Sequence, residues 1–312
     1  MTNAVIEAKG LTKRYGTRAA LDHIDLAIEE GEVFGLLGPN GAGKTTTILM
    51  IMGLTDVSEG TVRVLRLDPA RQPLVVKRHI GYMPDSVGFY DTLTARENLA
   101  YTGRLAGLER QHINRRIEEV LARVGLGAVV GQKVCTFSRG MKQRLGLADA
   151  LLKSPKIVIL DEPTSGLDPQ ATQEFLDLIR TLKQEGITII LSSHMLEKVQ
   201  AICDRVALFN AGRIALCGTV NDLGRQVLGG GHRILVEARG GKVEQALAAI
   251  PGIIRVRREG EQSYVLEADS DIRPLVAATV SGAGSELLSL GIRQASLESV
   301  YTRYFAEVAH AA

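Results

Sequence analysis

Residues 38–45 read GPNGAGKT, a segment whose residue types could bind phosphate. It matches the pattern G-x-x-x-x-G-K-[ST], with the apolar run VFGLL before it and the helix-like run TTILMIM after it. Glycines let backbone N–H groups converge on phosphate oxygens, and a helix N-terminus adds partial positive charge. In this pattern Lys44 reaches the terminal phosphates and the hydroxyl of Thr45 ligates Mg²⁺. The flanking strand and helix favour a phosphate-binding loop over a glycine-rich turn that happens to carry Lys and Thr.

A second segment, ILDEPTSGLD at 159–168, ends an apolar run in two adjacent acids. Charged side chains are almost never buried unpaired, so this strand end either meets solvent or presents negative charge to a ligand. Beside a phosphate-binding loop, Asp161 is expected to hold Mg²⁺ and Glu162 to orient or polarise an attacking water. The sequence has no Asn-Lys-x-Asp motif for reading guanine, which argues against a GTPase.

The order of motifs over about residues 4–224 resembles the ATP-binding cassette (ABC) ATPases. FSRGMKQRLGLADALL, just upstream of the acidic strand end, is similar to the signature segment of that family. Ser138 and Gly140 keep two residues of the signature, whereas Arg139 and Met141 stand where Gly and Gln are usual. A hydroxyl and backbone N–H groups at a helix N-terminus still suit a γ-phosphate.

The resemblance also assigns roles to single residues. It implies that Asp168, in the D-loop SGLD, communicates across a dimer, that His194 contacts the γ-phosphate, and that Tyr15 stacks on adenine. The catalytic residues would be Lys44, Glu162 and His194. The nucleotide site would comprise Tyr15, Gly38, Pro39, Asn40, Gly41, Ala42, Gly43, Lys44, Thr45, Thr46, Ser138, Arg139, Gly140, Met141 and Asp168.

One position departs from the family in a way that bears on chemistry. The loop after HIGYMP normally offers Gln to Mg²⁺, to the attacking water and to the membrane partner, but this chain has Asp85 there. An Asp oxygen can still ligate a hard cation, although it adds negative charge and reaches less far. The expected Mg²⁺ ligands are therefore Thr45, Asp85 and Asp161. The alternative is that Asp85, next to Ser86, merely caps the turn.

The elements that must position these residues follow strand–helix grammar. Early strand-like segments lead into the phosphate-binding loop, and KIVILDE and ITIILSSH resume the alternation after a helical insertion. This order predicts an α/β fold with a mainly parallel core sheet and an all-helical lobe at about 86–154. The resemblance adds an antiparallel β subdomain and defines the fold as the P-loop NTPase domain of ABC ATPases, residues 1–228.

A second domain is predicted at 229–312. GRQVLGGG at 224–231 reads as a linker because it ends in three consecutive glycines. Beyond it, the predicted elements follow the order β-α-β-β-α-β with an added terminal helix, which suggests a small ferredoxin-like α+β domain. This accessory domain shows no catalytic constellation and is expected to support dimerisation or regulation.

Composition narrows the function classes. The 312 residues carry a formal net charge of +2 and no Trp, which gives no case for a nucleic-acid partner. The three cysteines are widely spaced, so a disulfide framework is not expected and a reducing cytosol is the natural compartment. No apolar run is long enough to span a bilayer. We therefore expect a cytoplasmic protein, peripheral on the cytoplasmic face of the inner or plasma membrane.

Three functions fit these residues. The first is the ATP-hydrolysing subunit of a membrane transporter similar to type-2 ABC exporters, with ATP and Mg²⁺ as cofactors. Its partners would be a separate transmembrane permease and a second ATPase subunit, as a homodimer, because the chain carries one set of motifs. The second is a soluble, non-transport ABC ATPase, but tandem cassettes and long coiled-coil insertions are lacking. The third is a regulatory module that binds ATP with little turnover, against which the intact Lys44, Asp161, Glu162 and His194 argue.

Overall fold

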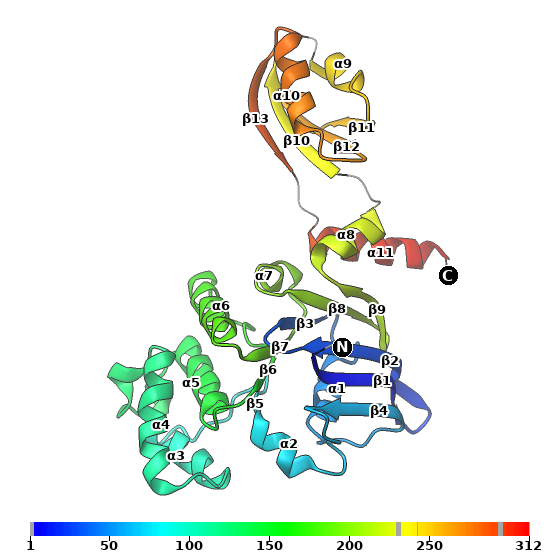
Figure 1. The fold of residues 1–312 in the computed structure, drawn as a ribbon. Helices are drawn as coiled ribbons and strands as arrows, with labels where there is room; N and C mark the ends of the chain where they lie inside the picture. Colours follow the sequence, from blue (N-terminus) through cyan, green and yellow to red (C-terminus); the bar gives the residue numbers. More distant parts are fainter. Residues whose placement is uncertain (1–2, 229–231, 242, 293–295, 312) are drawn as a thin grey trace. The chain divides into compact units, whose positions relative to one another are not determined.

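The chain forms two compact units, Met1–Gly218 and Thr219–Ala312 (Figure 1). The computed structural model describes residues 3–228, 232–241, 243–292 and 296–311. The boundary between the units precedes the one expected between residues 228 and 229. The phosphate-binding loop and the adjacent acids Asp161 and Glu162 lie in the first unit.

A six-stranded sheet with the order β5-β6-β7-β3-β8-β9 forms the centre of the first unit. Its strands are β3 (Val33–Leu37), β5 (Ile80–Met83), β6 (Ile157–Asp161), β7 (Thr188–Ser193), β8 (Arg205–Asn210) and β9 (Arg213–Gly218). All neighbours are parallel except the antiparallel pair β8–β9. Every residue of β3, β6 and β7 is buried, as expected for parallel strands covered on both faces. Their carboxyl ends meet at one edge, where open α/β sheets bind ligands.

A three-stranded antiparallel sheet with the order β2-β1-β4 packs beside the central sheet. Its strands are β1 (Ala4–Tyr15), β2 (Arg18–Glu29) and β4 (Glu59–Val64). Buried residues of both sheets and of helix α1 (Lys44–Ile51) share one apolar cluster, which includes Ile24, Phe34 and Ile48. This common core fixes the antiparallel strands relative to the phosphate-binding loop.

Helices form a lobe between β5 and β6 along the chain. The lobe contains α3 (Ala95–Leu105), α4 (Arg110–Arg123) and α5 (Arg139–Leu151), with 3₁₀ turns at Gly127–Val129 and Val134–Thr136. Thr94 and Glu97 form a capping box that starts α3, and Ser138 caps α5. The remaining helices of this unit are α2 (Pro73–His79), α6 (Pro169–Gln184) and α7 (Leu196–Gln200).

The second unit contains an antiparallel sheet with the order β11-β12-β10-β13. Its elements are α8 (Val220–Leu228), β10 (His232–Arg239), α9 (Val243–Ala248), β11 (Ile253–Arg258), β12 (Ser263–Ala268), α10 (Arg273–Gly282), β13 (Glu286–Ile292) and α11 (Leu297–Ala311). Helices α9 and α10 cover one face of the sheet through an apolar cluster that includes Leu247, Leu266 and Val276. From β10 to β13 the elements follow the expected β-α-β-β-α-β order.

The predicted α/β class is confirmed: a mainly parallel sheet, an antiparallel subdomain and a helical lobe are all present. The prediction of a linker was wrong for 224–228, because these residues belong to α8, which packs against α11 and buries Leu223. The rest of that predicted linker, 229–231, lies outside the described residues. Helix α2 was not expected from the sequence.

The central sheet and α5 approach so closely at Gly81 that no side chain fits. A Cβ on Gly81 would lie 2.2 Å from the carbonyl oxygen of Ala150, whereas a Cβ on Gly131 would meet nothing within 4 Å. We expect Gly81→Ala to lower the free energy of unfolding by about 1–3 kcal/mol through overpacking, and Gly131→Ala to change it little. Urea unfolding of both variants measures the difference. Equal midpoints would show that the contact tolerates a methyl group.

Candidate active site

The phosphate-binding loop joins β3 to α1 in a conformation that needs glycine. Gly38 (φ 146°) and Gly43 (φ 112°) have positive φ, and Gly43 is the N-cap of α1. A Cβ on Gly38 would lie 2.4 Å from the carbonyl oxygen of Phe209, and one on Gly43 would lie 2.5 Å from Leu21 Cδ2. The loop therefore packs against the sheet while the first turn of α1 presents its N–H groups, the arrangement that binds phosphate.

Lys44 is the cation of this loop. Its side chain is only 6% exposed, and its Nζ donates to the carbonyl oxygens of Gly38 (2.7 Å) and Pro39 (3.1 Å). Nζ also lies 3.6 Å from Oε1 of Glu162. A buried ammonium group needs such partners, since an unpaired charge in a protein interior is costly. The contact joins the loop after β3 to the acid after β6.

Asp161, the last residue of β6, is buried and faces Thr45. Thr45 Oγ1 donates to the Asp161 carboxylate, at 3.1 Å from Oδ2 and 3.4 Å from Oδ1. Ser192, at the paired position on β7, donates its hydroxyl to Asp161 Oδ1. Two hydroxyl groups thus satisfy a carboxylate that no cation of the chain neutralises among the described residues.

Glu162 has a left-handed backbone conformation, with φ 48°. Its N–H donates to the carbonyl oxygen (3.2 Å) and to the hydroxyl (3.0 Å) of Ser192. Its Oε2 lies 2.8 Å from Nδ1 of His194, and its Oε1 is buried without a hydrogen-bond partner among the described residues. Such strained residues persist only where the surroundings hold them, and they cluster at functional sites. Glu162 therefore has one oxygen committed to His194 and the other directed toward Lys44.

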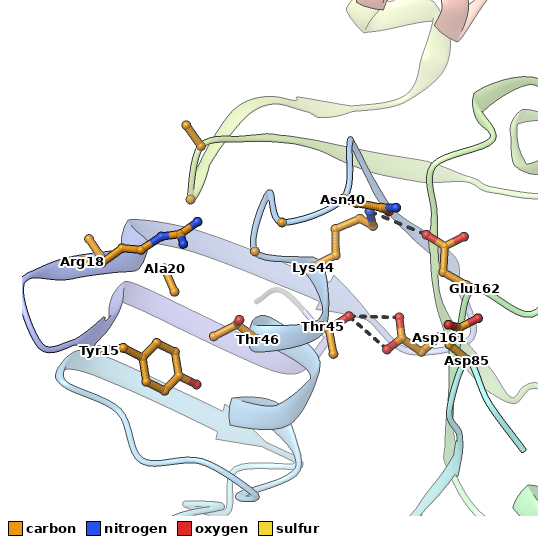
Figure 2. A pocket seen from close by; sticks show the side chains of 15 residues that line it. Tyr15, Arg18, Ala20, Asn40, Lys44, Thr45, Thr46, Asp85, Asp161 and Glu162 are labelled. Atoms are coloured by element: carbon orange, nitrogen blue, oxygen red, sulfur yellow. Dashed lines mark hydrogen bonds and ion pairs between the residues drawn. The ribbon is translucent and has the colours of Figure 1, made fainter. Parts of the chain in front are cut away.

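These side chains line a cleft of about 700 Å³ (Figure 2). The predicted residues that line it are Tyr15, Asn40, Gly41, Gly43, Lys44, Thr45, Thr46, Asp85, Asp161 and Glu162. Gly38, Pro39 and Ala42 belong to the same loop, and His194 joins the site through Glu162. Tyr15 is 52% exposed, and its ring centroid lies 5.0 Å from Lys13 Nζ. Figure 2 shows Tyr15 at the opposite end of the cleft from Asp161.

The signature residues and Asp168 do not line this cleft. Ser138 is the N-cap of α5, where its hydroxyl accepts from Met141 N at 3.2 Å, and Arg139 and Gly140 form the first turn of the helix. Asp168 is the N-cap of α6 and accepts from Ala171 N at 2.8 Å. The structure of one chain thus separates the predicted site into two groups of residues.

Asp85 lies in the cleft beside Asp161 (Figure 2). Its exposed carboxylate has no hydrogen bond or ion pair in the part of the chain that the structure describes, so nothing there supports a turn-capping role. The pKa of Tyr82 is raised to about 12 by burial, and then by the negative charges of Asp161 and Asp85. Both acids therefore act on the same small region at the end of β5 and β6.

Sequence reasoning missed several residues of the site. Arg18, Ala19, Ala20, Ala211 and Gly212 complete the lining of the cleft. Ser192 was also missed, although a strand that ends in Ser-Ser rather than in apolar residues was a usable signal. No local pattern marks the contribution of Arg18, at the start of β2, or of Gly212, in the turn between β8 and β9.

The oxygen-rich end of the cleft fits Mg²⁺. Thr45 and Asp161 offer hydroxyl and carboxylate oxygens, with Asp85 nearby, and Mg²⁺ prefers one or two carboxylates completed by water and substrate phosphates. Within the described residues no three His, Cys, Asp or Glu side chains form a metal site by themselves. Bound there, Mg²⁺ would offset negative charge on the phosphates.

A phosphate-binding loop, a buried lysine and paired acids at the carboxyl edge of a parallel sheet define a P-loop nucleotide-binding protein. The family model described as "ABC transporter" matches residues 21–165. The linearmycin resistance ATP-binding protein LnrL of Bacillus subtilis is 34% identical over 303 residues, covering 95% of this chain and 97% of that protein. The chain belongs to the ATP-binding proteins of ABC transporters, and these are ATPases.

Other relatives agree with this assignment. The ABC transporter ATP-binding protein NatA of Bacillus subtilis is 43% identical, with 65% of this chain and 83% of that protein covered. The bacitracin transport ATP-binding protein BcrA of Bacillus licheniformis is 41% identical, with 68% and 69% covered. A solved structure of the ATP-binding subunit of an ABC transporter matches with a TM-score of 0.65 and 32% identity, covering 72% of this chain and 94% of that chain.

Ser192 bridges the two acids, so its removal tests how they are held. We expect Ser192→Ala to lower the free energy of unfolding by about 1–3 kcal/mol, because it leaves an Asp161 oxygen and the Glu162 N–H each with one partner fewer in a buried setting. Ser86→Ala, at an exposed position, is the control and should change stability little. Thermal and urea unfolding measure both variants. Equal stability of the two would refute a supporting role for Ser192.

Proposed function

We propose that this chain is the ATP-hydrolysing subunit of an ABC exporter, which powers transport through a separate transmembrane permease. The observation that carries the proposal is the position of Glu162 between Lys44 and His194, next to the Thr45–Asp161 contact. In one cleft, this arrangement supplies a lysine that can bind phosphate, oxygen ligands for a metal ion, and a carboxylate that can accept a proton from water. A protein that only binds ATP would not need the contacts that hold the Glu162 carboxylate in this position.

The residues divide the work of hydrolysis. Lys44 and the N–H groups of the loop bind the β- and γ-phosphates, and Tyr15 stacks on the adenine at the other end of the cleft. Glu162 accepts a proton from the water as its oxygen attacks the γ-phosphorus. The bond between that phosphorus and the bridging oxygen breaks, giving ADP and phosphate. His194 keeps Glu162 oriented and donates toward the γ-phosphate, while Thr45, Asp161 and Asp85 would hold Mg²⁺, which would offset the negative charge of the phosphates.

A second copy of the chain completes the site. Ser138 and Asp168 belong to the predicted ATP site but lie at helix N-termini outside the cleft. A two-fold dimer would place the Ser138 of each copy over the ATP of the other and form two equal sites. A dimeric post-hydrolysis structure of the ATP-binding cassette MJ0796 with ADP and Pi, 25% identical with a TM-score of 0.60, supports this assembly. ATP favours the closed dimer because it contacts both copies only there.

The relatives support the proposal of a permease partner and a location at the membrane. Their names refer to linearmycin resistance and bacitracin transport, which fits export through a type-2 permease. No helix in the described part of the chain could cross a bilayer. We propose that the protein binds the permease at the cytoplasmic face of the membrane and has no nucleic-acid partner. The 229–312 domain would support dimerisation or regulation, and the match to LnrL, which covers 95% of this chain, includes most of it.

Glu162→Gln tests the role of the carboxylate. We expect ATP binding to be retained and turnover to fall by about 10²–10⁴-fold, because the amide cannot accept the proton. Glu261→Gln, at an exposed position in the second unit, is the control and should leave both unchanged. Steady-state ATPase assays and binding of a fluorescent ATP analogue measure the two effects. Near-normal turnover in the Glu162 variant would remove Glu162 from the chemistry.

Asp85→Gln tests the role of the third acid. The substitution removes a negative charge beside Asp161. We therefore expect the Mg²⁺ concentration for half-maximal ATPase activity to rise roughly three- to tenfold, because the attraction between a single charge and the cation is weakened by solvent in this partly exposed site. Asp56→Asn, outside the cleft, is the control. A Mg²⁺ titration at fixed ATP measures the shift. An unchanged titration would show that Asp85 does not act on the cation.

A further inference from the structure

Gln143 is a buried amide on α5 that the proposed chemistry does not use. It is 6% exposed and is followed along the helix by the buried residues Leu145, Gly146 and Leu147. A buried amide must be hydrogen-bonded. Its Nε2 donates to the carbonyl oxygen of Pro163 at 2.7 Å. The partner of Gln143 is thus the residue that directly follows Glu162.

Arg139 contacts the same loop one helical turn earlier. A Cβ on Gly166, which has φ 67°, would lie 2.2 Å from Cζ of Arg139, so the guanidinium group lies directly against this glycine. Arg139 and Gln143 are four residues apart and share one face of α5. The two side chains therefore hold both ends of the segment Pro163–Gly166.

The segment they hold is a tight turn that begins at Glu162. Ser165 N donates to the carbonyl oxygen of Glu162 at 3.1 Å, and Leu167 N donates to that of Thr164 at 3.3 Å. A shift of Pro163 would change the backbone of Glu162 directly, because the two residues share a peptide bond. The left-handed conformation of Glu162 thus depends on contacts from β7, through Ser192, and from α5, through Gln143.

Helix α5 also reaches the loop that carries Asp85. A Cβ on Gly146 would lie 3.1 Å from Met83 Sδ and 3.1 Å from Val87 Cγ1. Met83 and Val87 lie two residues before and two residues after Asp85. The N-cap of the same helix is Ser138. One rigid helix therefore contacts both acid-bearing loops and carries the predicted contact to the second copy.

We propose that Gln143 is a positioning residue for Glu162. By holding Pro163, it keeps the Glu162 carboxylate in a fixed position relative to α5. When Ser138 of the same helix binds the nucleotide on the second copy, the change in α5 therefore reaches Glu162 of the chain that carries that Ser138. This inference rests on the proposed function, because it assigns Glu162 a role in hydrolysis. Arg139 steadies the other end of the turn against Gly166.

Gln143→Met in the full-length chain removes the donor and keeps the side chain's length. We expect kcat to fall about 10- to 100-fold, the effect of one lost buried hydrogen bond on a positioned group, while the KM for ATP changes less than twofold. The matched control is Gln170→Met, an exposed amide whose Nε2 bonds Glu174 Oε1 at 3.1 Å. A normal kcat in the Gln143 variant, or equal changes in kcat and KM, would overturn the proposal.

A double-mutant cycle separates positioning from a general structural role. If Gln143 acts through Glu162, adding Gln143→Met to Glu162→Gln should cause little further loss of turnover. Additive losses of turnover would contradict the proposal for Gln143. The proposed function itself is tested separately, by the turnover of the Glu162→Gln variant alone. Hydrogen exchange of the Ser165 and Leu167 amides gives a test without turnover. It should be faster in the Gln143 variant and unchanged in the control, and unchanged exchange in both would also overturn the proposal.

Discussion

The contact between Lys44 and Glu162 is the interaction on which the rest of the site depends. It joins a loop that follows β3 to an acid that follows β6, across the intervening strand β7. Both groups are largely removed from solvent, so each needs the other and the polar groups around them. The glycines of the loop allow the lysine to approach, and Ser192 on β7 and His194 directly after β7 fix the acid.

The fold supplies this geometry through the order of its parallel strands. Strands β6, β7 and β3 are neighbours, so the residues after them meet at one edge although they are far apart in sequence. The antiparallel sheet adds Tyr15 and Arg18 to the cleft and shares the apolar core beneath it. Helix α5 contacts two of the segments that follow these strands, the turn after Glu162 and the loop around Asp85.

Much of this could be predicted from the sequence because the informative patterns are local. The phosphate-binding loop, the acidic strand end and the switch from strand-like to helical periodicity each lie within a few residues. Gln143 and Arg18 could not be assigned in this way, since one bonds the distant carbonyl oxygen of Pro163 and the other lines a cleft formed with distant segments. Helix α8 was missed for a similar reason: its packing against α11 stabilises a segment that the three glycines following it in the sequence made look like a linker.

In the proposed dimer, the residues around Lys44 and Glu162 act together with the Ser138 of a second copy. The most direct measurement is the ATPase activity of a mixture of two variants, Lys44→Ala and Ser138→Arg. Each homodimer would lack a complete site, whereas the mixed dimer would have one site with Lys44 from one copy and Ser138 from the other. If the two copies share each site in this way, mixing the two inactive variants restores ATPase activity. A mixture as inactive as its components, in which mixed dimers are shown to form, would contradict it.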